Sequence, residues 1–278
     1  MAYECYTQTS KNYDLTRQPI GLSILLGCFA TVGRTLADLV VLDAGCGTGS
    51  YAIELQRWVK RIEGVDATKE MVAQAKTKAE ALQLPSTRLS FQQSRIEKLP
   101  FDDAQFDCVM VNQVLHHLDD DSHAGFPQHR ETLNELHRVM RVGGVLVINT
   151  CSTTQLHGGW WYRELFSKAF DRLEQRLIPL PRLVELLEES GFSYHGNNVP
   201  TDAVFQGEAY FEPTGLLKEE WRHGDSVFAL ATHEELENAC ARIRQMKKDD
   251  SLEDYVSRQD ARRPHIGQVT FVHAVKKP

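Results

Sequence analysis

Three glycines at alternate positions are the strongest sign of chemistry in this sequence. Gly45, Gly47 and Gly49 follow a mostly apolar run at 40–44, and an amphipathic run that includes Trp58 comes next. Glycine tolerates a left-handed backbone and lets a ligand approach the main chain, which a Cβ atom would block. A helix after the turn would offer free N–H groups to that ligand. The pattern predicts a strand, a ligand-binding turn and a helix, although the glycine string alone is weak evidence.

An acidic residue follows at a spacing that strengthens this interpretation. Asp66 ends the next predicted strand, at 61–66, and lies about 20 residues after the glycines. A carboxylate in this position reaches ribose hydroxyls that are bound over the first turn. The alternative is that Asp66 caps a helix that opens at Thr68, and both roles can hold at once.

Four segments carry a resemblance to a known family: Asp43-Ala44-Gly45-Cys46-Gly47-Thr48-Gly49, Gly64-Val65-Asp66, Leu99-Pro100-Phe101 with Phe106-Asp107, and Leu136 to Gly144. Their order and spacing resemble the motifs of class I S-adenosylmethionine-dependent methyltransferases, in the small-molecule (type 11) branch that includes ubiquinone- and menaquinone-biosynthesis enzymes. The resemblance covers residues 38–150. It implies an α/β fold with a Rossmann-like seven-stranded sheet, helices on both faces and an antiparallel last strand. It also implies S-adenosyl-L-methionine as cofactor and S-adenosyl-L-homocysteine as product.

The resemblance also implies which residues hold the cofactor. A leader at 10–17 would fold over it, with Tyr13 against the sulfonium and Arg17 on a carboxylate, unless Tyr13 merely packs and Arg17 forms a surface ion pair. Relatives usually carry aspartate where Arg95 stands, and arginine cannot accept from the adenine amino group. The expected cofactor contacts are Tyr13, Arg17, Asp43, Gly45, Cys46, Gly47, Gly49, Asp66, Ala67, Arg95, Ile96, Asn112 and Gln113.

Two amides and two histidines follow the apolar run at 106–111. Ligands of open α/β sheets lie beyond the carboxyl ends of the strands, so Asn112 and Gln113 are expected at the methyl end of the cofactor. His116 and His117 come one turn later, and either could take a proton from the methyl acceptor. The alternative is a structural role, because paired histidines recur here in relatives with unrelated substrates.

Aromatic residues gather just after the predicted strand at 145–150. His157, Trp160, Trp161 and Tyr162 are candidate substrate contacts, since aromatic side chains give large contact areas at a small cost in entropy. The alternative is that Trp160 and Trp161 anchor the next helix in the core.

Composition argues against a nucleic acid partner, and the resemblance implies a small-molecule acceptor. The net charge is −7 and no run of lysine or arginine is dense, so no nucleic acid partner is expected. The uncharged run at 18–33 is shorter than the roughly 20 residues of a spanning helix. It is expected to form a buried or lid helix, with neither a membrane span nor a secretory signal. The oligomeric state stays open.

Cysteine and histidine usage favours a cytoplasmic protein without a metal site. The six cysteines contain no CxxC pair, which is typical of reduced thiols. The histidines near the centre of the chain do not place three ligands on one helix face, and no cysteine or acid falls at zinc spacing. These are His116, His117, His123 and His129.

A single methyltransferase domain over residues 1–278 is expected. It comprises an N-terminal lid at 1–37, a cofactor-binding core at 38–150 and substrate-side elements at 151–278, with an insertion at about 198–265 before the last strand. A helix at 130–141 is expected to end at Gly143 and Gly144, which form its C-terminal cap. The charged stretch 249–263 is expected to be mobile.

The predicted reaction is in-line transfer of a methyl group to a small molecule. One alternative is a nicotinamide-dependent oxidoreductase, but its fingerprint places the third glycine three residues after the second, whereas Gly49 follows Gly47 by two. A second alternative is a regulatory or scaffold protein that binds the cofactor without catalysis.

Overall fold

The computed structural model describes residues 12–118, 120 and 125–278. The contacts between residues divide the chain into two compact units, a sheet unit and a helical unit. The sheet unit consists of Gly21–Thr150, Ile178–Asn198 and Thr270–Pro278. The helical unit consists of Cys151–Leu177, Val199–Val269 and the described part of Met1–Ile20.

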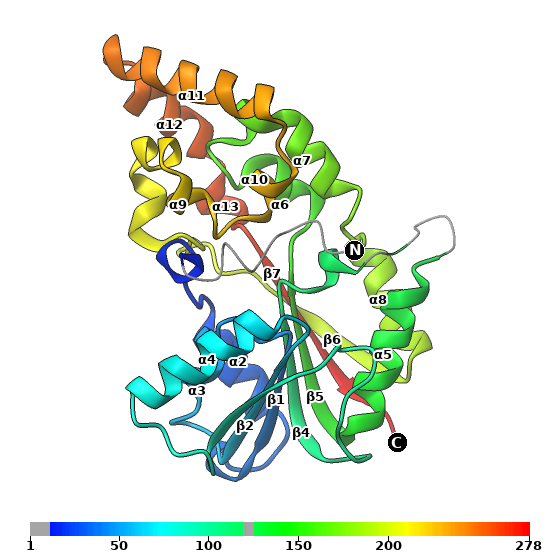
Figure 1. The fold of residues 1–278 in the computed structure, drawn as a ribbon. Helices are drawn as coiled ribbons and strands as arrows, with labels where there is room; N and C mark the ends of the chain where they lie inside the picture. Colours follow the sequence, from blue (N-terminus) through cyan, green and yellow to red (C-terminus); the bar gives the residue numbers. More distant parts are fainter. Residues whose placement is uncertain (1–11, 119, 121–124) are drawn as a thin grey trace. The chain divides into compact units, whose positions relative to one another are not determined.

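Within the described residues, the sheet unit contains one seven-stranded sheet in the order β3-β2-β1-β4-β5-β7-β6 (Figure 1). The strands are β1 (Val40–Ala44), β2 (Arg61–Asp66), β3 (Leu89–Gln93), β4 (Phe106–Asn112), β5 (Met140–Thr150), β6 (Phe192–Asn198) and β7 (Thr270–Lys276). Strands β1 to β5 pair in parallel, and β7 is antiparallel to both β5 and β6. The predicted Rossmann-like sheet with an antiparallel last strand is confirmed.

Helices cover both faces of this sheet, as expected for parallel strands with apolar interiors (Figure 1). They are α2 (Leu22–Ala30), α3 (Ser50–Leu55), α4 (Lys69–Ala81), α5 (Pro127–Val139) and α8 (Leu180–Glu189), with short 3-10 turns η2 (Leu36–Asp38) and η3 (Leu115–His117). Helices α5 and α8 pack together. Their leucines join the apolar residues of β1, β4 and β5 in one buried cluster. This cluster fixes the strand ends that carry the predicted site.

The predicted C-terminal cap of the helix before β5 is wrong. Helix α5 ends at Val139, and Met140 already has an extended backbone, with φ −85° and ψ 148°. Gly143 and Gly144 lie inside β5, where its register against β4 is irregular. A Cβ atom on Gly144 would lie 2.9 Å from the backbone oxygen of Asp107. Glycine is needed there because two strands approach closely, so it does not mark the end of a helix.

Helix α3 is shorter than the sequence interpretation suggested, and helix α2 lies in the uncharged run at 18–33. Helix α3 stops at Leu55, and Trp58 lies beyond it with 49% of its surface exposed, so it is not part of an apolar helix face. Helix α2 buries Leu25, Cys28 and Phe29 and contacts β5. The uncharged run at 18–33 therefore contributes a core helix to the sheet unit.

The helical unit is built from short helices and 3-10 turns. These are η1 (Tyr13–Leu15), α6 (Thr153–Gly158), η4 (Arg163–Phe166), α7 (Ser167–Glu174), η5 (Gly207–Phe211), η6 (Pro213–Leu217), α9 (Glu219–Arg222), α10 (Ser226–Leu230), α11 (His233–Lys248), α12 (Leu252–Asp260) and α13 (Arg263–Ile266). Capping boxes start α6 and α11, at Ser152 with Gln155 and at Thr232 with Glu235. Each box satisfies two backbone N–H groups that the first helical turn leaves without partners.

The charged stretch 249–263 forms helices α12 and α13, which corrects the expectation that it is mobile. Arg263 is 7% exposed and pairs with Asp260, which also accepts a hydrogen bond of 2.6 Å from the Tyr210 hydroxyl. The guanidinium group of Arg263 also lies over the rings of Tyr210 and Phe211. The charges of Arg263 and Asp260 are therefore paired inside the helical unit, whereas composition alone suggested that they face the solvent.

No helix among the described residues is both long enough and apolar enough to cross a bilayer.

Candidate functional site

The glycine turn between β1 and α3 has a left-handed backbone at all three glycines. The φ angles are +83° at Gly45, +53° at Gly47 and +77° at Gly49. A Cβ atom on Gly45 would lie 2.3 Å from Val114, and one on Gly49 would lie 2.7 Å from Phe91. A Cβ atom on Gly47 would meet no protein atom within 4 Å. Packing against the protein therefore demands the outer two glycines, and only Gly47 borders open space that a ligand can enter.

Asp66 bridges the glycine turn and the start of α4. Its Oδ2 accepts from the backbone N–H of Gly47 at 2.9 Å, and its Oδ1 accepts from the N–H of Thr68 at 2.8 Å. Burial raises the pKa of this carboxyl, and the two backbone hydrogen bonds oppose that rise. Thr68 is the N-cap of α4 and makes no side-chain capping bond, and Asp66 bonds only the N–H of this residue ahead of the first helical turn. Each carboxylate oxygen has a second lone pair and can still accept from a ribose hydroxyl.

Asp43 and Asn112 are buried polar groups at the carboxyl ends of the neighbouring strands β1 and β4. Asp43 is 1% exposed, and neither its carboxylate oxygens nor the Asn112 amide makes a hydrogen bond of normal geometry. Burial and the nearby Asp66 raise the pKa of Asp43 to about 7, which the facing Asn112 amide and the Ala52 N–H partly oppose. Buried polar groups of this kind need a partner. This pair can therefore receive a polar, cationic ligand group.

The segment after β3 places its two predicted adenine residues differently. Ile96 is 5% exposed and belongs to the core cluster, whereas the Arg95 side chain is 71% exposed and pairs with Glu97 at 2.5 Å. The structure therefore does not bring Arg95 together with the other candidates. Ala67 follows Asp66 and is exposed, and its carbonyl accepts a 2.9 Å hydrogen bond from Gln93.

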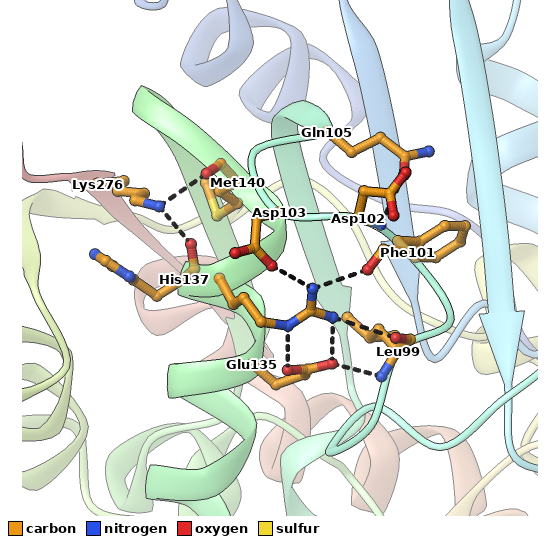
Figure 2. Close-up of polar contacts among 10 residues, drawn as sticks. Leu99, Phe101, Asp102, Asp103, Gln105, Glu135, His137, Met140 and Lys276 are labelled. Carbon is orange, nitrogen blue, oxygen red and sulfur yellow. Dashed lines mark hydrogen bonds and ion pairs between the residues drawn. The ribbon is translucent and has the colours of Figure 1, made fainter.

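Helix α5 holds the far end of this segment (Figure 2). Glu135 accepts from the N–H of Leu99 at 2.6 Å and pairs with Arg138. Arg138 donates to the carbonyls of Leu99 at 3.2 Å and Phe101 at 2.8 Å, and to Asp103 at 2.7 Å. The Arg138 guanidinium lowers the pKa of Glu135. These bonds of Glu135 and Arg138 hold the loop that carries Ile96 against α5.

His116 and His117 form the 3-10 turn η3 after β4. Their ring centroids are 4.1 Å apart; His116 is buried and His117 is partly exposed. A positive charge on His117 would lower the pKa of the Asp66 carboxyl, against the rise that burial causes. Cys46, in the glycine turn, is buried, and burial raises the pKa of its thiol well above the ordinary value. A thiol with a raised pKa is a poor nucleophile.

A polar relay that the sequence interpretation missed runs along the same sheet edge. Gln113 donates from Nε2 to Asn149 Oδ1 at 3.0 Å, and Asn149 donates from Nδ2 to the Tyr51 hydroxyl at 3.3 Å. Gln113 has φ +56°, a left-handed backbone that is rare outside glycine. No motif marks Asn149 or Tyr51. The one sequence signal is the polar end of the β5 run, directly after four buried apolar residues at 145–148.

The remaining predicted residues lie in the helical unit, and most of those described here have partners within it. Tyr13 is in η1, and the Arg17 guanidinium lies 4.4 Å from the centre of the Phe205 ring. Residues 10 and 11 of the predicted leader lie outside the described residues. Trp161 is fully buried and donates to Tyr210, while the equally buried Tyr162 bonds Asp225 and Gln206. These bonds are those of core anchors.

Trp160 and His157 are placed differently from this pair. Trp160 is 8% exposed, and its indole N–H has no hydrogen-bond partner among the described residues. His157 is on the surface of α6 and pairs with Glu174 at 2.9 Å. No further residue in the described part of the helical unit is assigned to a substrate on these grounds.

The described residues contain no group of three or more side chains that could hold a metal ion. His129 is buried and bonds Asp120 at 2.5 Å, and burial lowers the pKa of its ring. His123 lies outside the described residues. The described cysteines, Cys28, Cys46, Cys108, Cys151 and Cys240, are free thiols, and Cys5 also lies outside.

Comparisons with known proteins agree with this geometry. Residues 42–148 match the family described as "Methyltransferase domain". An uncharacterized methyltransferase of Bacillus subtilis, YcgJ, is 34% identical over 119 residues, which cover 43% of this chain and 43% of that protein. A probable S-adenosylmethionine-dependent methyltransferase of Mycolicibacterium smegmatis is 29% identical over 187 residues, 67% of this chain and 61% of that protein. The chain thus spans about half the length of the curated relatives it matches.

A solved structure extends the similarity to nearly the whole chain. A putative methyltransferase from an antibiotic biosynthesis pathway of Anabaena variabilis superposes with a TM-score of 0.71 at 21% identity, over 94% of this chain and 99% of that one. At this identity the similarity shows the fold. Motifs, sheet order and the matched family agree, and residues 42–148 are similar to a methyltransferase domain.

Proposed function

We propose that this protein transfers a methyl group from S-adenosylmethionine to a small-molecule acceptor by in-line displacement. The observation that carries the proposal is the edge formed by β1, β2 and β4. There the open space at Gly47, the Asp66 carboxylate and the buried Asp43–Asn112 pair lie at adjacent strand ends. The carboxyl ends of parallel strands are where open α/β sheets bind ligands.

The residues present fit this cofactor. Asp66 would hold the ribose hydroxyls, because its oxygens keep acceptor capacity. The buried carboxylate of Asp43, with Asn112 beside it, would receive the cationic amino-acid end and gain the partner that it lacks. Ile96 would border adenine, and Gln113 would flank the methyl end. When bound, S-adenosylmethionine supplies a methyl group on a positively charged sulfur that is a good leaving group.

The protein's own contribution is alignment and, for some acceptors, proton removal. Holding donor and nucleophile about 3 to 3.5 Å apart supplies much of the rate enhancement. His117, whose charge acts on Asp66, or His116 would accept a proton from a hydroxyl or ammonium group of the acceptor. Tyr13, Arg17, Ala67 and Arg95 remain predicted cofactor contacts, and His157, Trp160, Trp161 and Tyr162 remain predicted substrate contacts. A single domain and a cytoplasmic location are part of the same proposal.

A turnover assay with methyl-labelled S-adenosylmethionine tests the proposal. The purified protein is incubated with panels of phenols, amines, thiols and activated carbon acids, and labelled product and S-adenosylhomocysteine are both measured. We expect transfer to at least one acceptor class, with Asp66→Ala slower by at least about tenfold, or 1.4 kcal/mol. Glu80→Ala, an exposed acid in the last turn of α4, is the control. Cofactor binding without transfer to any panel would instead support the non-catalytic alternative.

A further inference from the structure

Gln113 is held in an unfavourable backbone conformation at the end of β4. Its φ of +56° is left-handed, a backbone conformation that is unfavourable for a non-glycine residue. Two hydrogen bonds to one residue offset this cost. The Gln113 backbone N–H donates to the Asn149 carbonyl at 2.9 Å, and its side-chain Nε2 donates to Asn149 Oδ1 at 3.0 Å. Strained residues over-determined in this way cluster at functional sites.

Asn149 is a rigid support for this side chain. It is 1% exposed, lies on β5 opposite Asn112, and uses both ends of its amide. The amide oxygen accepts from Gln113, and the amide nitrogen donates to the hydroxyl of Tyr51. Tyr51 is in the first turn of α3, directly after the glycine turn. The relay therefore ties the ends of β4 and β5 to the element that borders the cofactor site.

The relay determines which end of the Gln113 amide faces the ligand. Because Nε2 points into Asn149, the carbonyl oxygen Oε1 is left on the other side, and it accepts no hydrogen bond from the described residues. The side chain is only half-buried, so a ligand can reach it. An amide oxygen carries partial negative charge and attracts a cation more strongly than a neutral group, and this preference grows where water is excluded.

We propose that Asn149 and Tyr51 are positioning residues that turn the Gln113 oxygen toward the sulfonium end of the cofactor, so that the site favours the charged methyl donor over its uncharged product. This inference rests on the proposed function. The donor and the product share their adenine, ribose and amino-acid groups and differ only in the methyl group and the charge on sulfur. Asp43 and Asp66 would therefore act on both ligands equally, whereas the Gln113 oxygen would act on one.

Calorimetric titration of the full chain with S-adenosylmethionine and, separately, with S-adenosylhomocysteine tests the inference. Gln113→Met keeps the side-chain length without the amide, Asn149→Leu removes the support, and Tyr51→Phe removes one hydroxyl. We expect Gln113→Met and Asn149→Leu to raise the Kd of S-adenosylmethionine about tenfold. The Kd of S-adenosylhomocysteine should rise less than about twofold. Tyr51→Phe should shift the ratio in the same direction by a smaller factor.

Gln93→Met is the matched control, because it removes another amide at the same sheet edge, one that bonds the Ala67 carbonyl. It should leave the ratio of the two Kd values unchanged. Equal weakening of both ligands by Gln113→Met, or no change in either, would overturn the positioning role. If Asn149→Leu fails to fold, the half-buried Gln113→Met and Tyr51→Phe still decide. A wild-type protein that binds neither ligand would refute the proposed function itself, which is a separate outcome.

Discussion

A buried carboxylate without a hydrogen-bonded partner destabilises a fold when it is ionised, and Asp43 is such a group. It lies at the end of β1 beside Asp66, and burial together with this neighbouring charge raises its pKa to about 7. The cationic end of the proposed cofactor would compensate that charge. If the proposed function is right, Asp43 serves ligand binding at the expense of the stability of the empty domain.

Asp43 should make the stability of the ligand-free protein depend on pH. Its folded pKa of about 7 exceeds the ordinary value of 3.8, so the stability that it contributes is present below about pH 4 and is lost as pH rises through 7. Asp43→Asn should therefore gain thermal stability over wild type at pH 8 but not at pH 4, with a gain of up to about 4 kcal/mol. Thermal unfolding at both pH values measures this. Asp102→Asn, at an exposed acid, is the control, and an equal gain at both pH values would contradict the account.

The three glycines of the turn should separate into structural and ligand-binding positions. Gly45→Ala places a methyl group 2.3 Å from Val114 and should lower stability by about 2–4 kcal/mol, combining backbone strain and overpacking. Gly47→Ala meets no protein atom, so it should cost only the backbone term, about 1–2 kcal/mol. Its main effect should be weaker binding of S-adenosylhomocysteine. Thermal unfolding and calorimetry on both variants test this, and equal loss of stability in the two would count against it.

At the scale of elements, helix α5 stabilises the loop that carries Ile96. Arg138 joins Glu135, Asp103 and the carbonyls of Leu99 and Phe101 in one network, and Lys276 of β7 donates to the carbonyls of His137 and Met140 at the end of α5 (Figure 2). Helix α5 therefore connects the loop that carries Ile96 to the antiparallel strand β7.

Removal of the Arg138 guanidinium should destabilise the sheet unit. Arg138→Met leaves the buried face of Glu135 and two loop carbonyls without their donor, which should cost about 1–3 kcal/mol. Arg182→Met on α8 is the matched control, because among the described residues this arginine pairs with the exposed acids Glu185 and Glu189, and its loss should cost much less than the loss of Arg138. Denaturant unfolding compares them. Similar losses in both variants would show that the Arg138 network contributes little.

The elements themselves were largely predictable, because their signals are local. Strand β1 spans the predicted run at 40–44, β4 contains the apolar run at 106–111, and α4 begins at Lys69, directly after Thr68, where a helix was expected to open. The end of α5 was not predictable, since Gly143 and Gly144 fit a helix cap as well as a strand irregularity. Only the close approach of β4 to β5 distinguishes these two possibilities.

The site was predictable only where one motif contains the whole interaction. The glycine turn and Asp66 form such a motif. The relay of Gln113, Asn149 and Tyr51 joins residues 36 and 98 positions apart, and it exists because β4 and β5 are neighbours in the sheet. Such a contact depends on strand order. In the same way, Trp161 and Tyr162 are typical of pocket walls in sequence, yet their polar atoms bond Tyr210, Asp225 and Gln206 inside the helical unit.

For the whole molecule, the sheet edge at β1, β2 and β4 is the proposed binding site for S-adenosylmethionine. A ligand that binds only the folded state raises the unfolding temperature, so S-adenosylhomocysteine at 100 times its Kd should stabilise the protein by about 2.7 kcal/mol. In Asp66→Ala, which should bind at least about tenfold more weakly, the same ligand concentration should stabilise the protein by no more than about 1.4 kcal/mol.

The most direct test is calorimetric titration of the purified protein with S-adenosylhomocysteine, with NADH as the second ligand. We expect micromolar binding of S-adenosylhomocysteine, with a binding free energy of about −8 kcal/mol, and no heat from NADH. Asp66→Ala should weaken this binding more than about tenfold, while Glu80→Ala should leave it unchanged. Absence of S-adenosylhomocysteine binding, or binding of NADH in its place, would contradict the assignment of the glycine turn and with it the proposed reaction.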